Sequence, residues 1–187
     1  MNRKLYMRGL MACIGLGVIL AAPARACGLH PTISGGIETS YPGALNIAVA
    51  VATAREQGVL PQAKPDSLSA GDAYSVMLAD LKRLQSQLET VHRNGTDTSA
   101  AEFSVVLIGP SLWSHYQLTP TGVQARFHVH GPVNGKPVVL THHVVLRALL
   151  DGHMTAGQAA ELGLIAFSGN NTDPVRKTFE TGFQSRT

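Results

Sequence analysis

Histidine is the reactive side-chain type in which this sequence is richest, with eight copies in 187 residues. His128 and His130 lie two positions apart in residues 123–130, where apolar and polar residues alternate as in a half-buried strand. Side chains two apart in a strand project from one face, and a turn at 119–122 would bring His115 beside them. Imidazoles that meet at one point bind copper or zinc. The same row of polar residues is also typical of the solvent-facing side of a sheet, which is the simpler interpretation.

The remaining histidines do not extend this pattern into a catalytic site. His142 and His143 are adjacent, so in a strand they point to opposite sides. His92 and His153 lie near predicted helix ends, where an imidazole is expected to contact helix carbonyl groups. The sequence has no Gly-x-Ser-x-Gly, His-Glu-x-x-His, Gly-x-Gly-x-x-Gly or phosphate-loop motif. No catalytic residue is predicted, and the sequence favours a non-enzymatic protein.

Residues 1–26 have the features of a secretory signal peptide. Three basic residues are followed by an apolar run at 9–22, which is shorter than the ~20 residues of a spanning helix. A small-x-small cleavage site follows at Ala24-Arg25-Ala26. We therefore expect a bacterial periplasmic protein with no integral membrane segment after cleavage. Retention as an uncleaved N-terminal anchor is the alternative.

Cleavage would leave Cys27 as the lone cysteine, because Cys13 lies in the removed segment. A lone cysteine cannot form an internal disulfide. Its thiolate, the imidazole of His30 and the new terminal amine could together hold copper or zinc. A free thiol, a disulfide between chains and attachment of a lipid are the alternatives.

The charge of the sequence argues against binding to nucleic acid. The whole chain has a net charge of +3, but residues 1–26 contain four basic residues and no acidic ones. Without them, 11 Lys and Arg residues stand against 12 Asp and Glu residues, a net charge of −1. A chain so balanced lacks the basic surface that contacts phosphates.

Residues 27–70 are predicted to form an N-terminal extension. Within it, residues 42–57 form a helix that is apolar on nearly every side. Such a helix is expected to be buried on several sides or to cover something apolar. Residues 59–70 are polar, contain prolines and are expected to form a linker.

The period of the apolar residues then separates a long helix from a sheet. Apolar residues at spacings of three and four predict a helix over 71–93, with one stripe: Met77, Leu81, Leu84, Leu88 and Val91. Asn134-Gly135 is a strong hairpin signal between two of the strands that follow. Four strands are expected, at 103–108, 112–118, 123–130 and 136–141, joined as an antiparallel meander.

The C-terminal part returns to short helices. A helix follows His142, and Thr155 is expected to cap a second one that runs to Leu162. A fifth strand at 164–168 and a last helix at 173–183 complete the chain. The predicted class is α+β, with an antiparallel meander of four to five strands packed on one face by helices.

The sequence of Val138–Gly169, VVLTHHVVLRALLDGHMTAGQAAELGLIAFSG, carries a resemblance to a known family. A strand leads to a helix that ends at Gly152, a second short helix ends at Gly163, and a strand closes on Gly169. This order resembles the sterol carrier protein domain, over residues 71–187. The resemblance implies an apolar tunnel between sheet and C-terminal helices that binds fatty acyl chains or sterols. The residues expected to line it are Phe127, Val129, Leu146, Leu149 and Leu150. A fully packed core without a tunnel is the alternative.

Three functions remain open at this point. The preferred one is an exported, non-enzymatic binding or accessory protein that holds an apolar small molecule, with no resident cofactor expected. The second is a periplasmic copper or zinc binding and delivery protein that uses His115, His128 and His130, or Cys27 and His30. The third is a structural partner in a periplasmic protein complex, with helix 42–57 as its docking surface.

Overall fold

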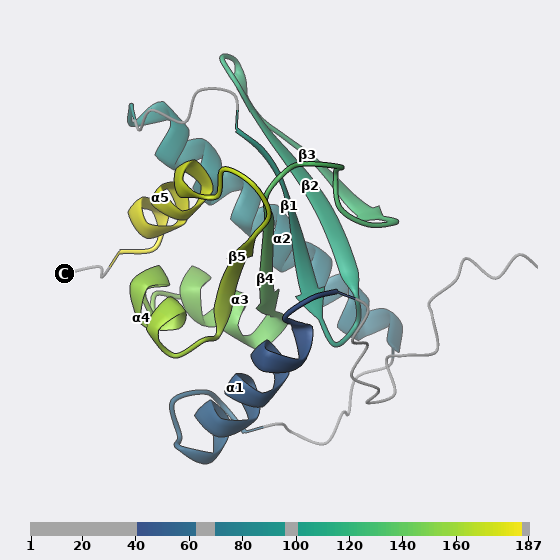
Figure 1. The fold of residues 1–187 in the computed structure, drawn as a ribbon, viewed down its shortest axis with the longest axis vertical. Helices are drawn as coiled ribbons and strands as arrows, with labels where there is room; N and C mark the ends of the chain where they lie inside the picture. The colour runs from purple at the N-terminus through teal and green to yellow at the C-terminus, as the bar shows by residue number, and fades with distance from the viewer. Residues whose placement is uncertain (1–40, 63–69, 96–100, 185–187) are drawn as a thin grey trace, which may run out of the picture.

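The computed structural model describes residues 41–62, 70–95 and 101–184 (Figure 1). The expected signal peptide and the Cys27–His30 pair therefore lie outside the described residues. The elements are α1 (Ala44–Glu56), α2 (Ala70–Arg93), β1 (Glu102–Ile108), β2 (Leu112–Thr119), β3 (Gly122–Val129), β4 (Val138–His142), α3 (His143–Leu150), α4 (Ala156–Glu161), β5 (Ile165–Ser168) and α5 (Asp173–Gly182). The predicted α+β class and the order of its elements are confirmed.

The apolar stripe of α2 forms one side of the core, as its spacing predicts. Its five predicted members, Met77, Leu81, Leu84, Leu88 and Val91, are all buried. Against it packs the sheet face that carries Phe103 and Tyr116, whose rings are stacked 5.4 Å apart. The hydroxyl of Tyr116 donates a hydrogen bond to the carbonyl of Leu81 at 3.1 Å, which fixes α2 to the sheet. Burial of this phenol raises its pKa.

The five strands form one sheet in the order β3-β2-β1-β4-β5. All neighbouring pairs are antiparallel except β1 and β4, which are parallel. The hairpin predicted at Asn134-Gly135 is therefore wrong, because β4 does not pair with β3. A turn does form there, since Lys136 N–H donates to Val133 O at 3.2 Å, but it lies within a longer connection.

That connection crosses the sheet face opposite α2 before the chain enters β4. The backbone N–H of Val133 donates to the Ser104 hydroxyl of β1 at 3.0 Å. A ring nitrogen of His115 in β2 contacts the carbonyl of Gly131 at 2.6 Å. The residue types at Asn134-Gly135 favour a turn. The long-range contacts of the connection, in contrast, determine that β4 pairs with β1.

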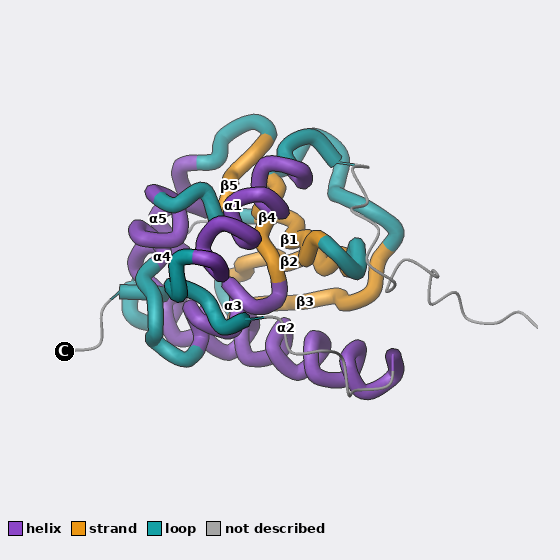
Figure 2. The backbone as a smooth tube through the Cα atoms, turned by 90° about the horizontal axis from the view of Figure 1, so that it is seen from below, coloured by secondary structure: helices purple, strands orange, loops and turns teal. Residues whose placement is uncertain are grey.

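Helices cover both faces of the sheet (Figure 2). On the α2 side, Phe179 of α5 contacts the rings of Phe103 and Phe167 at 6.2 and 5.8 Å. On the other side lies α1, where a Cβ added at Gly43 would sit 3.7 Å from the Leu140 side chain. The helix predicted over 42–57 buries a single face, with Ile47 and Val51 inward and Leu45 and Val49 exposed. The helix from the predicted N-terminal extension thus shares one core with the sheet.

Among the described residues, no helix combines the length and the apolar character that crossing a bilayer requires.

Candidate functional site

A hollow of about 300 Å³ opens beside α4 in the described part of the chain. We call it the α4 hollow, and its lining residues are Val59, His153, Met154, Gln158, Glu161 and Leu162. They come from three segments: the turn after α1, the connection from α3 to α4, and α4 with the residue that caps its end. A volume of this size lies at the lower end of the range for small-molecule sites.

Short-range backbone hydrogen bonds position the two connecting segments. After α1, the N–H groups of Val59 and Leu60 both donate to the carbonyl of Ala54, at 2.8 and 3.1 Å. This turn buries Leu60 and leaves Val59 46% exposed. After α3, the N–H of His153 donates to the carbonyl of Ala148 at 2.9 Å.

A capping box fixes the start of α4, as Thr155 predicts. The Thr155 hydroxyl accepts from the N–H of Gln158 at 3.1 Å, and Gln158 Oε1 accepts from the N–H of Thr155 at 2.9 Å. The far end of α4 lies against α1, since a Cβ added at Gly163 would sit 3.8 Å from that of Ala50. The hollow therefore lies where α4 and the end of α1 approach each other.

The α4 hollow combines apolar surface with a few polar groups. Met154 is buried, while Val59 and Leu162 are 46% and 43% exposed. Covering the exposed apolar surface of such side chains with a ligand is energetically favourable. His153, Gln158 and Glu161 are polar groups that could bind one polar end of a ligand.

The predicted ligand-binding residues lie in two other places. Leu146, Leu149 and Leu150 are buried in the core on α3. Phe127 and Val129 are half-buried on β3, an edge strand that β2 and β1 separate from β4. None of the five lines the α4 hollow. Contact of these residues with a ligand stays a prediction.

Val59 and Leu162 are not among the site residues predicted from the sequence, because both lie at places where a helix ends. Val59 follows Gly58 in a segment interpreted as a polar linker, and Leu162 precedes Gly163 at the end of α4. The available signal was a large apolar residue beside a terminating glycine, where the chain turns toward the surface.

The structure gives His128 and His115, two of the three histidines predicted to share a metal site, contacts on opposite faces of the sheet. A register shift next to Trp113 leaves His128 as the extra residue of a bulge, with a positive φ of 58°. Its Nδ1 then lies 3.3 Å from the hydroxyl of Tyr74 on α2, while His115 contacts Gly131 across the sheet. The expectation that His128 follows regular strand alternation is therefore wrong.

No group of three or more His, Cys, Asp or Glu side chains that could hold a metal occurs within residues 41–62, 70–95 and 101–184. Copper or zinc binding at His115, His128 and His130 stays a prediction. The same holds for the pair Cys27 and His30, which lies outside those residues.

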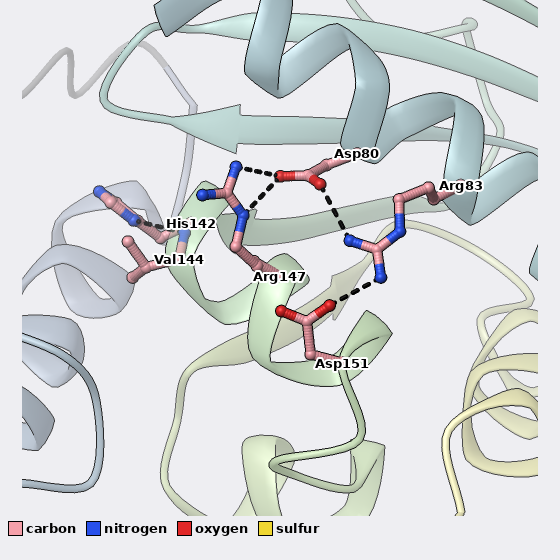
Figure 3. A network of polar contacts seen from close by, with 6 residues as sticks. All are labelled: Asp80, Arg83, His142, Val144, Arg147 and Asp151. Atoms are coloured by element: carbon pink, nitrogen blue, oxygen red, sulfur yellow. Dashed lines mark hydrogen bonds and ion pairs between the residues drawn. The ribbon is translucent and has the colours of Figure 1, made fainter. Parts of the chain in front are cut away.

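Charged side chains also form an ion-pair network between α2 and α3 (Figure 3). Asp80 is buried and accepts two hydrogen bonds from Arg147, at 2.6 and 3.0 Å, and one from Arg83 at 3.3 Å. Arg83 also donates to Asp151 at 2.7 Å. This contact lowers the pKa of the Asp151 carboxyl and raises that of the Arg83 guanidinium. The network holds α3 against α2.

Comparison with known proteins gives similarities of fold. No protein-family model matches the chain, and no curated protein matches its sequence. The chain is similar to the solution structure of palmitated SCP2L2 from Aedes aegypti, a sterol carrier protein-like protein, with 18% identity and a TM-score of 0.45. The similarity covers 58% of this chain and 95% of that one.

Part of a larger enzyme is also similar in structure. The stereoselective inverting sec-alkylsulfatase Pisa1 from Pseudomonas sp. shows 14% identity and a TM-score of 0.36, over 49% of this chain and 14% of the sulfatase. A double mutant of that sulfatase shows 10% identity and a TM-score of 0.42, over 78% of this chain and 20% of the mutant.

Proposed function

We propose that this chain is an exported, non-enzymatic protein that binds an apolar small molecule in the α4 hollow. The observation that carries the proposal is the pairing of two exposed apolar side chains, Val59 and Leu162, around one hollow of about 300 Å³. Covering such side chains stabilises a complex by roughly 25 cal/mol per Å² of buried apolar surface.

The polar side chains of the hollow favour a ligand with one polar end. Gln158 Oε1 already accepts the Thr155 N–H, which leaves its amide NH₂ group as a donor. His153 lies on the same hollow and adds a second polar contact. An apolar chain with a hydroxyl, carbonyl or carboxyl group at one end matches this arrangement.

Binding of a fluorescent fatty acid to the purified protein tests the site. We expect uptake by the unchanged protein, and about tenfold weaker binding in a Val59→Gln/Leu162→Gln variant, because two apolar contacts are lost. Leu45→Gln is the matched control, since Leu45 is 49% exposed on α1 and is not a lining residue. The proposal would be contradicted if the double variant and the Leu45→Gln control bound the fatty acid with equal affinity. It would also be contradicted if the unchanged protein took up no fatty acid.

Export is tested separately from ligand binding. The protein expressed with all its residues in a bacterium should be recovered from the periplasm with Cys27 at its N-terminus. N-terminal sequencing of the recovered protein checks this. A chain that keeps Met1 and stays with the membrane fraction would instead support the uncleaved anchor.

A further inference from the structure

Two imidazoles lie at one end of the parallel strand pair, and the charge of an arginine of α1 acts on one of them. In β1 and β4, Ile108 pairs with His142, and α3 begins at the next residue. The rings of His142 and His143 lie 4.4 Å apart. The charge of Arg55, in the last turn of α1, acts on His142. We call Arg55, His142 and His143 the Arg55 cluster.

The hydrogen bonding of His142 settles which of its ring nitrogens carries the proton. Its Nδ1 accepts the backbone N–H of Val144 at 3.3 Å and so caps α3 (Figure 3). Burial, with His143 and Arg55 as positive neighbours, lowers the pKa of His142 to about 3, so the ring is neutral at pH 7. A neutral ring that accepts at Nδ1 must carry its hydrogen on Nε2. His142 therefore presents an N–H donor on the side away from α3.

Glycine at position 109 keeps that donor open. Gly109 follows β1 with a φ of +96°, a conformation that favours glycine. A Cβ added there would lie 3.6 Å from His142 Nε2, in the space next to the donor. No side chain of residue 109 occupies this space.

Arg55 supplies a second donor that the described protein does not use. Its Nε is buried and has no hydrogen-bond partner among the described residues. Its positive charge has no acidic side chain paired with it within residues 41–62, 70–95 and 101–184. A buried N–H group without an acceptor destabilises the folded protein. Most buried donors in proteins therefore have a hydrogen-bond acceptor, either in the protein or in a bound molecule.

We propose that the Arg55 cluster binds an oxyanion, either a carboxylate or a phosphate group. Such a group accepts from Arg55 Nε–H and from His142 Nε2–H, and its negative charge offsets the positive charge of Arg55. A metal cation does not fit, because Arg55 repels it. The cluster shares no residue with the lining of the α4 hollow, so this proposal does not depend on the apolar ligand.

Ring-nitrogen NMR spectra of the histidines, recorded on the purified protein, test the proposal. The probes are inorganic phosphate and acetate, added separately, with sodium chloride as the ionic-strength control. We expect saturable shifts of the His142 and His143 signals with at least one probe, and little effect of chloride. Shifts with phosphate alone identify a phosphate site, and shifts with acetate alone identify a carboxylate site. Loss of one signal in a His142→Asn variant assigns the resonances.

Substitution of Arg55 distinguishes this site from general screening. Arg55→Gln should weaken binding by about tenfold or more, since a charged donor is lost. Arg126→Gln, which removes an exposed arginine of β3, should leave it unchanged. Arg55→Lys keeps the charge but lacks the Nε–H group and should bind with intermediate affinity. No shift of either ring with about 10 mM of either probe, or equal shifts in Arg55→Gln, would overturn the proposal.

Discussion

Asp80 is the side chain on which the contact between α2 and α3 depends. Its carboxylate is buried, and the side chains that donate hydrogen bonds to it are charged: Arg147 from α3 and Arg83 from α2 itself. A buried carboxylate is tolerated only when such donors replace water. Figure 3 shows the two arginines approaching it from different sides.

Asp80→Asn should therefore destabilise the fold, because it removes the negative charge that Arg83 and Arg147 share and replaces one acceptor oxygen with an NH₂ donor. We expect a loss of roughly 2–3 kcal/mol in the free energy of unfolding, measured by urea denaturation with circular dichroism. Asp151→Asn is the control, since its contact to Arg83 is solvent-exposed and should contribute less than about 1 kcal/mol. Equal losses in the two variants would show that the network has no buried centre.

His142 gives the fold a dependence on pH. Its pKa of about 3 in the folded state lies below its ordinary value of 6.5, so between these values the unfolded chain binds more protons. Acidification from pH 7.5 to pH 5 should therefore lower the free energy of unfolding by roughly 1–2 kcal/mol through this residue. His142→Asn keeps an acceptor for the Val144 N–H and should show a smaller dependence. Urea denaturation at both pH values measures it, and identical slopes would contradict the assignment to His142.

Single residues also show which features local sequence patterns do not determine. Alternation in 123–130 predicts β3, but the pattern of residue types does not reveal that Val129 pairs with Trp113 while Phe127 pairs with Ser114. The extra residue, His128, then contacts Tyr74 from an element more than 50 positions away. A bulge of this kind depends on the partner strand, which local periodicity does not contain. The candidate metal site was inferred from that periodicity.

At the scale of elements, the capping box of α4 links local sequence to the α4 hollow. Thr155 and Gln158 exchange hydrogen bonds, and Gln158 also lines the hollow. A six-residue helix has little stability of its own, so its start depends on this cap and on packing. The cap thus fixes one wall of the proposed site.

Thr155→Ala should cost about 1 kcal/mol in the free energy of unfolding and should weaken binding of the fluorescent fatty acid. Thr155→Ser keeps the hydroxyl that accepts the Gln158 N–H and should restore both properties. Urea denaturation and fluorescence titration measure the two effects. If Thr155→Ala destabilises the protein without changing affinity, Gln158 plays no part in binding.

The elements that the sequence predicts correctly are those specified by local patterns. The α2 stripe, the Thr155 cap and the inward positions Val175 and Phe179 of α5 all follow from spacing or turn chemistry within a few residues. The pairing of β4 with β1 does not, since Asn134-Gly135 favours a turn but carries no information on the strand that follows. Strand order depends on contacts such as Ser104 with Val133.

On the scale of the whole molecule, α1 closes the second face of the sheet. Ala44, Ile47 and Val51 are each only 2% exposed and belong to the same core cluster as Val106 and Leu140 of the sheet. When both faces of a sheet are apolar, each face must be covered by another element of the protein. Arg55, in the last turn of α1, and Val59, in the turn after it, belong to the two proposed sites, so docking of this helix positions both.

Detachment of α1 should therefore disturb the molecule far more than its outer surface suggests. Ile47→Asp places an unpaired charge in the contact with the sheet and should cost at least ~3 kcal/mol in the free energy of unfolding. It should also increase the fluorescence of an added naphthalene sulfonate dye, because the uncovered sheet face binds the dye. Val49→Asp introduces the same charge on the same helix, where the side chain is 57% exposed, and should change stability by less than about 0.5 kcal/mol. Equal behaviour of the two variants would show that α1 is not part of the common core.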